Sequence, residues 1–388
     1  MNNFSWAMIG LCFCTSVASA ADSDVPVPIQ IPLPTSVAPT RAWSPTLYIS
    51  GSLDVVVRHD SGTVGGSNNS VGPGGLRSSR LTFGANSPIG YGLKSQIVLE
   101  GGIAPDTGLG ANNPPGQGNG FVFGRTAAAG LGSDSLGYIS LGRQFTPMQA
   151  VSAGPANDPF GGAWLGGVAT LYNKQTIASN SISYTYGYTS EALLRPAPKT
   201  GLGVAVLYSF GEGVSPAPKR SGQQEGFNVS WGDGRWWFGY AYEGLHGSNS
   251  TLSATAPATD KPLQRQQTLG GAYDFGWARL ILSVNRGTSS DHTLNRTNYD
   301  VAGTVPVTSS SKLLFMYGRA NDKTAANADF KSLQLGYQYD FTPNTAVYGA
   351  FAQADNSAHS AVAPAGMTGT VPKGGTGRSS EIGVRVMF

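Results

Sequence analysis

Glu381-Ile-Gly-Val-Arg-Val-Met-Phe388, the last eight residues of the chain, follow a strand pattern whose two faces differ in polarity. Successive side chains of a strand point to opposite faces, so every second residue shares a face. The apolar face consists of Ile382, Val384, Val386 and Phe388, whereas the other face carries Glu381 and Arg385. Such charges would be misplaced inside a water-soluble protein, but they are expected where lipid surrounds a polar lumen. The pattern predicts the closing strand of a transmembrane β-barrel, and it requires a matching first strand.

The stretch Thr46–Arg58 supplies that partner. Its apolar face consists of Leu47, Ile49, Leu53, Val55 and Val57, and its other face includes Asp54 and Arg58. The same alternation recurs along the chain, for example at Trp236–Glu243 and Leu333–Asp340. Short turns alternate with long loops rich in Gly, Ser, Asn and Pro, which is typical of a barrel with short periplasmic turns and long outer loops. We therefore predict an all-β fold, a transmembrane antiparallel β-barrel.

The strand count is sixteen in our best division of residues 46–388. Fourteen and eighteen strands are the alternatives, because Asn180–Ser190 and Tyr299–Lys312 are ambiguous. An even number is required if both ends of the barrel sheet are to meet on the same side of the membrane.

Composition favours the same class of protein. Charged residues make up 12% of the chain, well below the soluble average of about 25%, and 54 of its 388 residues are Gly. Beyond residue 20 we find no apolar run of the roughly 20 residues that a spanning helix needs. The formal charge is only +3 and no basic run occurs, so nucleic acid is not expected as a partner.

Two segments precede the predicted barrel. Residues 1–20 resemble a secretory signal peptide, with an apolar stretch from Trp6 to Val17 and a small-residue cleavage signal at Ala18-Ser-Ala20. An N-terminal membrane anchor is the alternative. Both cysteines, Cys12 and Cys14, lie in this segment, so the mature chain would have no disulfide or thiol chemistry.

Residues 21–45 form a second segment, in which Val25–Pro34 alternates proline with apolar residues and favours polyproline II. We predict a periplasmic extension that acts as a spacer. A docking segment for another envelope component is the alternative.

Several stretches resemble one known family, the trimeric Gram-negative porins of the Neisseria and Burkholderia type. The resemblance is carried by Thr46-Leu-Tyr-Ile-Ser-Gly51, Ser79-Arg-Leu-Thr-Phe-Gly84, Phe123-Gly-Arg125, Gly137-Tyr-Ile-Ser-Leu-Gly-Arg-Gln144 and Asp158-Pro-Phe-Gly161. Two features depart from the family pattern, namely Val386, where the family has His, and the proline-rich segment. The resemblance implies a bacterial outer-membrane homotrimer without a cofactor, surrounded by outer-membrane lipid, through which small hydrophilic solutes and ions diffuse passively.

The resemblance also implies that the third loop, Pro147–Lys174, folds into the barrel and narrows the lumen. Basic side chains of the wall would then face acidic groups, and the resulting field would sort ions. The candidate constriction residues are Arg58, Arg77, Arg80, Arg125, Arg143, Lys94, Asp158 and Asp54. Because arginines outnumber the acids, we expect a weak anion preference.

Two of these candidates have alternative interpretations. Strict alternation would put Arg143 on the lipid face at a cost of about 2–4 kcal/mol, so we predict that a bulge at Gly142 turns it inward. Arg143 would otherwise reach the outer membrane surface from the lipid face. Asp158 could instead cap a short turn.

Other classes of protein are less compatible with the sequence. A substrate-specific channel would differ from a general porin only in its lumen, and saturable uptake of one class of solute would distinguish it. A barrel-embedded enzyme needs an acid, a base and a nucleophile at one site. The four histidines, His59, His246, His292 and His359, are far apart in sequence and lack metal-ligand spacing, so we predict no enzyme activity and no metal site.

Overall fold

The computed structural model describes residues 29–31, 45–111, 118–152, 158–160, 176–188, 200–211, 222–246 and 263–388. The predicted signal peptide and most of the proline-rich extension lie outside these ranges.

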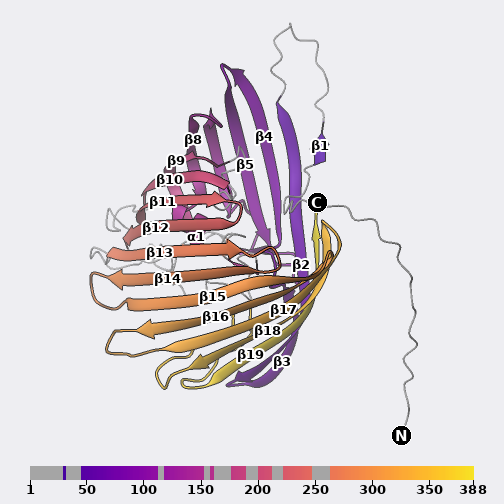
Figure 1. Cartoon of the computed structure of the whole chain (residues 1–388), viewed down its shortest axis with the longest axis vertical. Coiled ribbons are helices and arrows are strands. Elements are labelled where there is room, and N and C mark those ends of the chain that lie inside the picture. The colour runs from indigo at the N-terminus through magenta and orange to yellow at the C-terminus, as the bar shows by residue number, and fades with distance from the viewer. Residues whose placement is uncertain are drawn as a thin grey trace, which may run out of the picture.

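Sixteen of the described strands form one closed antiparallel barrel (Figure 1). They are β2 (Thr46–Thr63), β4 (Arg80–Gly90), β5 (Leu93–Ile103), β7 (Thr126–Ser133), β8 (Gly137–Phe145), β9 (Ile177–Tyr186), β10 (Thr200–Phe210), β11 (Gln223–Asp233), β12 (Trp236–His246), β13 (Leu263–Asp274), β14 (Arg279–Ser289), β15 (Asn295–Thr308), β16 (Ser311–Asp322), β17 (Phe330–Thr342), β18 (Thr345–Asn356) and β19 (Thr376–Met387). The predicted barrel and its strand number are confirmed.

Four short elements accompany the wall: β1 (Ile29–Ile31), β3 (Gly66–Pro73), β6 (Gly110–Ala111) and the helix α1 (Pro147–Ser152). Residues 60–78, whose composition indicates the first outer loop, instead contain a strand: β3 pairs with the part of β2 from Val55 to Thr63, most of which also pairs with β19. The hairpin turns between Thr63 and Gly66, and Gly66 has a φ of 87°, which favours glycine. No helix among the described residues is long and apolar enough to cross a membrane.

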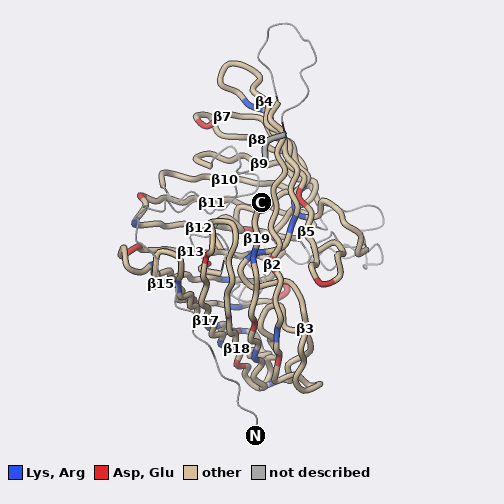
Figure 2. Tube along the Cα trace, turned by 90° about the vertical axis from the view of Figure 1, so that its right-hand side faces the viewer, with Lys and Arg blue, Asp and Glu red and all other residues tan. Residues whose placement is uncertain are grey.

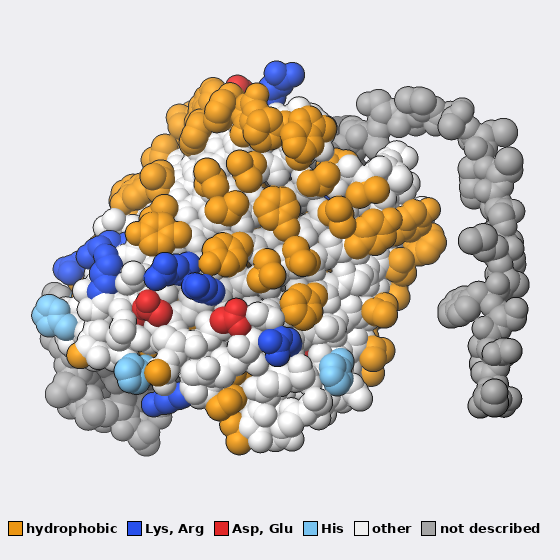
Figure 3. Space-filling model, turned by 60° about the horizontal axis from the view of Figure 1, so that its bottom comes forward, with side chains coloured by type: hydrophobic (Ala, Val, Ile, Leu, Met, Phe, Trp, Pro, Cys, Tyr) orange, Lys and Arg blue, Asp and Glu red, His pale blue; other side chains and the backbone are white. Residues whose placement is uncertain are grey.

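The two faces of the wall have the polarity that the sequence predicts. On β12, Trp236 and Phe238 are 45% and 48% exposed, whereas Trp237 between them is 1% exposed. The outer face in Figure 3 carries many apolar side chains, shown in orange. Aromatic side chains cluster at the end where the turns are short, where Trp236 packs against Tyr273 at 4.3 Å between ring centroids. Amphipathic rings of this kind prefer a membrane–water interface.

The barrel closes where β19 pairs with β2, as predicted from the two ends of the strand ladder. At the last residue, the amide of Gly51 donates to the Phe388 carbonyl at 2.7 Å, and the amide of Phe388 donates back at 3.1 Å. Within lipid a backbone group without a partner costs several kcal/mol, so closure satisfies both strands.

One buried ion pair spans this seam. Arg58 and Glu381 are directly opposite each other in the register, and the guanidinium Nη2 lies 2.9 Å from Glu381 Oε2. Arg58 also donates to the carbonyls of Pro73 and Gly366, so its side chain is covered by β3 and by the loop before β19. Its burial is nearly complete, with 2% of the residue exposed.

The strand β1 continues the seam beyond the end of β19. Its residues pair antiparallel with β2, with Ile29 opposite Ile49 and Ile31 opposite Leu47. These positions of β2 lie past Gly51, where β19 has already ended. Part of the proline-rich segment therefore covers an edge of β2 that would otherwise lack a partner.

Replacing Arg58 with Met should destabilise the barrel by about 3–5 kcal/mol, because Glu381 would remain buried without its counterion. The double variant Arg58→Met with Glu381→Leu should recover part of this loss, although the Pro73 and Gly366 carbonyls stay without their donor. Urea unfolding of the protein refolded in lipid vesicles measures both effects. Equal destabilisation of the single and double variants would contradict a role for the pair.

Deleting residues 22–44 should expose the edge of β2 and speed amide hydrogen exchange at Leu47–Ile49. The matched control is deletion of residues 22–27, which retains β1 and should leave exchange unchanged. If the amides of Leu47–Ile49 exchange at the same rate in both deletion variants as in the full chain, β1 does not protect this edge.

Candidate functional site: the lumen at the third loop

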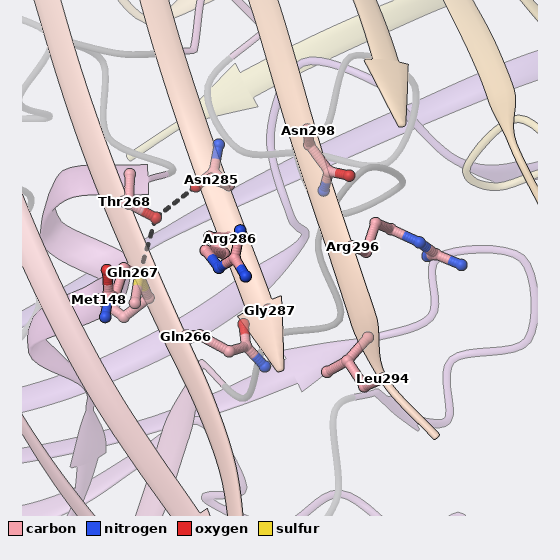
Figure 4. Close-up of a pocket in the computed structure, with 10 residues that line it drawn as sticks. All are labelled: Met148, Gln266, Gln267, Thr268, Asn285, Arg286, Gly287, Leu294, Arg296 and Asn298. Atoms are coloured by element: carbon pink, nitrogen blue, oxygen red, sulfur yellow. Dashed lines mark hydrogen bonds between the residues drawn. The ribbon is translucent and has the colours of Figure 1, made fainter. Parts of the chain in front are cut away.

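The third loop begins inside the barrel. Helix α1 follows β8 directly and contacts β10, β11, β12 and β13. Asn228 of β11 donates its amide to the Pro147 carbonyl at 2.8 Å, and the Thr268 hydroxyl of β13 lies 3.1 Å from the Met148 sulfur (Figure 4). Inward-facing polar side chains thus fix the first turn of the loop against the wall.

Apolar contacts fix the loop farther along. Val151 and Phe160 are 0% and 1% exposed. Both lie against glycines of the wall: a Cβ atom at Gly336 of β17 would be 2.9 Å from the Phe160 ring, and one at Gly239 of β12 would be 3.2 Å from Val151. The inward fold of the loop is therefore confirmed for residues 147–152 and 158–160, and its position depends on small residues in the wall.

Asp158 lies within this packed part of the loop. Its Oδ1 accepts a hydrogen bond from the Phe160 amide at 2.8 Å, and the residue is 1% exposed. This is the geometry of a carboxylate that caps a short turn. Because its side chain is buried in this way, the geometry does not support Asp158 as the acidic side of an open constriction.

Two predicted arginines meet at one carboxylate on the inner face. Arg80 of β4 and Arg125, just before β7, lie 3.2 Å and 2.6 Å from the two oxygens of Glu100 on β5. Thr82 also donates to Glu100, at 2.9 Å. The side chain of Glu100 is 4% exposed, whereas those of Arg80 and Arg125 are 19% and 12% exposed. This cluster carries a net charge of +1, and its exposed part is cationic.

The cluster faces the third loop across the lumen. In the order of the closed sheet, β4 and β13 are eight of sixteen strands apart, which is half the circumference. The arginine cluster therefore occupies the wall opposite the β11–β13 region that holds α1. Figure 2 shows where acidic and basic residues lie along the strands.

Arg143 and Arg77 have their own partners. The register of β8 and β9 shifts between Gly142 and Gln144, and Gly142 has a φ of 123°, so the irregularity predicted at this glycine is present. The Arg143 guanidinium donates to the Gly124 carbonyl at 2.6 Å and to the Ser179 hydroxyl. Its inward direction stays a prediction. Arg77 is half-buried, and its amide donates to Asp54 at 2.7 Å.

Two further constriction candidates, Arg58 and Asp54, are buried under neighbouring segments of the chain. Arg58 is buried in the seam pair with Glu381, under β3. Asp54 is 0% exposed and accepts hydrogen bonds from the Tyr348 hydroxyl at 2.7 Å and from the amides of Leu76 and Arg77. Both side chains lie on the inward register of β2 but are covered by neighbouring segments, because alternation assigns a face and not its coverage by loops. Their part in a constriction stays a prediction.

Lys94 lies at the end of the barrel where the turns are short, 3.1 Å from Asp134 in the turn between β7 and β8. The hydrogen bonds from Tyr138 and Lys94 lower the pKa of Asp134, so this carboxylate stays charged near neutral pH. Lys94 is therefore a rim residue.

Sequence reasoning did not identify the polar residues around α1. Figure 4 shows a small pocket there, lined by Met148, Gln266, Gln267, Thr268, Asn285, Arg286, Gly287, Leu294, Arg296 and Asn298. These uncharged polar residues form no recognisable sequence motif. The sequence could have indicated them only through strand alternation, which places Gln266, Thr268, Asn285 and Asn298 at inward positions, where they are buried. Among the described residues no group of three or more His, Cys, Asp or Glu could hold a metal ion.

Comparison with known proteins gives consistent results. The sequence profile of the family described as Gram-negative porin matches residues 7–359. Outer membrane porin protein 32 of Delftia acidovorans is 26% identical over 376 residues, which is 89% of this chain and 94% of that protein. An outer membrane porin of Bordetella pertussis is 28% identical over 59% of this chain and 56% of its own length.

Solved structures share the fold. The anion-selective porin from Comamonas acidovorans aligns with a TM-score of 0.72 at 22% identity, covering 89% of this chain and 100% of that one. The trimer form of OmpT from Vibrio cholerae aligns with a TM-score of 0.61 at 18% identity, covering 89% and 99%. Because the family profile covers most of the sequence and the fold is a closed sixteen-stranded barrel, this chain belongs to the Gram-negative porins of the bacterial outer membrane.

Proposed function

We propose that this porin forms a water-filled channel for passive diffusion of small hydrophilic solutes and ions, with a weak preference for anions. The observation that carries the preference is the unequal exposure of opposite charges on the inner face. The buried carboxylates of the wall strands are at most 8% exposed, namely Asp54, Asp60, Glu100, Glu243, Asp300, Asp322 and Glu381. Several arginines on the same face keep part of their surface open, among them Arg80, Arg125, Arg296 and Arg385, whereas Arg58 is 2% exposed.

This asymmetry sets the sign of the field that a permeating ion meets. A charge that is buried and hydrogen-bonded is partly neutralised by its partners, whereas an exposed guanidinium acts directly on the lumen. Asp340 is an exception, since 30% of its side chain is exposed, but Arg385 lies 3.2 Å away and offsets it. The related Comamonas porin is described as anion-selective.

The proposal includes export and an absence of catalysis. Residues 1–20 would direct the chain across the inner membrane and be removed, and residues 21–45 would extend into the periplasm. We propose no enzyme activity, in keeping with the dispersed histidines and with a family of channels.

The working unit that we propose is a homotrimer joined near β2 and β19. The outer face of this seam is flat and apolar: Leu53, Val57, Ile382 and Val384 are 42%, 64%, 74% and 47% exposed. Gly51 does not contribute, because the ring of Phe388 from the same chain already covers it. The trimer form of the Vibrio cholerae structure supports this choice of assembly.

Opposite shifts in ion selectivity should result from changing two neighbouring residues of the arginine cluster. Arg125→Gln removes a cation and should lower the chloride-to-potassium permeability ratio, whereas Glu100→Gln leaves two cations and should raise it. Reversal potentials across a salt gradient in planar bilayers measure both. Lys94→Gln, at the rim, is the control and should change little. A cation preference of the native channel would overturn the proposal.

Single cysteines can test the assembly, since the only two cysteines lie in the predicted signal peptide. Leu53→Cys should cross-link between subunits with a bismaleimide in outer membranes, giving a dimer band on denaturing gels. Leu269→Cys on β13, also outward-facing and 58% exposed, is the matched control and should stay monomeric. If the Leu53→Cys and Leu269→Cys variants react equally with the bismaleimide but Leu53→Cys gives no dimer band, a trimer joined at this seam is contradicted.

A further inference from the structure

The residues between β3 and β4 leave the wall of the barrel and fold inward. Strand β2 pairs with β3 along one half of its length and with β4 along the other half (Figure 1). The last residue of β3, Pro73, is opposite Val55. The first residue of β4, Arg80, is opposite Ser52. The six residues Gly74–Ser79 therefore face only two residues of β2, and the excess has to leave the sheet. We call Gly74–Ser79 the inner segment.

Asp54 holds the inner segment on the lumen side of the wall. It lies on the inward face of β2, and its Oδ2 accepts hydrogen bonds from the amides of Leu76 and Arg77 at 3.0 and 2.7 Å. Its backbone carbonyl accepts a hydrogen bond from the Gly74 amide at 2.9 Å. Its backbone amide donates to Ser79 Oγ at 2.9 Å. One residue thus binds both ends and the middle of the inner segment, and hydrogen bonds to an ionised carboxylate are among the stronger ones in proteins.

Tyr348 of β18 completes this arrangement from two strands away. Its hydroxyl donates to Asp54 Oδ1 at 2.7 Å and accepts a hydrogen bond from the Gly75 amide at 2.9 Å. The ring reaches β2 because it lies across Gly383 of β19, where a Cβ atom would be 2.6 Å from the ring. Tyr348 is 4% exposed, so it acts on the carboxylate of Asp54 and on the inner segment from a buried position.

The fit at Gly74 leaves no room for a side chain. A Cβ atom at this residue would overlap Asp54 Oδ1 and the hydroxyl oxygen of Tyr348. Gly65, in the turn between β2 and β3, is different, because the nearest atom to a Cβ there would be the Thr63 hydroxyl oxygen at 3.9 Å. The position of the inner segment therefore depends on a close approach that only glycine permits.

The inner segment lies beside the third loop on the inner face. Phe160 of the third loop packs against Gly336 of β17, whereas the inner segment is bound by residues of β18 and β2. In the order of the sheet these strands follow β17, with β19 between them. Leu76 is 5% exposed and belongs to the same apolar cluster as Phe160. Two inward folds thus take up neighbouring parts of the lumen, which reduces the area left for solutes.

We propose that Tyr348 is a positioning residue that acts through Asp54 and holds the inner segment as a second constriction element beside the third loop. Neither side chain needs to touch a solute, because the inner segment itself limits the passage. The segment also carries Arg77, so the same contacts place a cation that the sequence predicts for the constriction. The inference rests on the proposed channel function, but it does not depend on the anion preference.

Gly74→Ala should displace the inner segment from Asp54 and raise the single-channel conductance by about 1.5-fold, because a wider passage carries more ions. Swelling of liposomes should show faster entry of large sugars. Gly65→Ala adds the same methyl group in open space, so it is the matched control and should behave like the native protein. Single-channel recordings in planar bilayers report only folded channels, so a loss of stability alone would not change the conductance.

Tyr348→Phe tests the hydroxyl group without adding volume. It should also raise the conductance, by a smaller factor than Gly74→Ala. Combining the two changes should give no further rise over Gly74→Ala, because both act on the same contact. The control is Tyr184→Phe, which removes a hydroxyl that donates to the Leu136 carbonyl at the end with short turns and should leave the conductance unchanged.

The outcomes separate this inference from the channel proposal. Native conductance in both Gly74→Ala and Tyr348→Phe would overturn the positioning role and leave the channel proposal intact. An equal rise in Gly65→Ala, or a further rise in the double variant, would overturn it as well. If the native protein conducts no ions at all, the channel proposal fails and this inference fails with it.

Discussion

The pairing of β19 with β2 is the constraint on which the rest of this structure depends. A sheet with open edges cannot remain in lipid, because each unpaired backbone group there costs several kcal/mol. The closing strands are joined by hydrogen bonds between Gly51 and Phe388 at one end and by the Arg58–Glu381 pair farther along. Once the ring is closed, every strand has two partners, and side chains are free to differ completely between the faces.

Closure also determines what the lumen can contain. On the inner face of the wall, glycines at positions such as Gly239 and Gly336 leave room for Val151 and Phe160 of the third loop. The loop is therefore held by fit against the wall as well as by hydrogen bonds from Asn228 and contact with Thr268. Helix α1 lies against β11–β13, and Arg80 and Arg125 lie on the opposite wall, where we propose that they determine the electrostatics of the passage.

The sequence predicts the barrel well because its period is enforced at every strand. One misplaced residue would turn a whole strand inside out, so the alternation at Glu381–Phe388 or Trp236–Glu243 is a strong signal. Positions in the site are harder to predict, because alternation states which face a residue occupies and not what covers it. Arg58 and Asp54 were assigned to the inner face correctly, yet β3, the segment before β4 and the loop near Gly366 bury them. Gly, Ser and Asn dominate residues 60–78, so the sequence indicates a loop where the structure has the end of β2 and the strand β3.

The sign of the lumen follows from side-chain length more than from composition. The whole chain carries a formal charge of only +3, which by itself implies no selectivity. Aspartate and glutamate have shorter side chains, so on the inner face their carboxylates remain near the backbone and accept hydrogen bonds from neighbouring groups. Asp54, for example, accepts hydrogen bonds from the backbone amides of Leu76 and Arg77. Arginine has a longer side chain that extends past its partner and keeps part of the guanidinium in water. With nearly equal numbers of opposite charges, this difference in side-chain length would account for the weak anion preference that we propose.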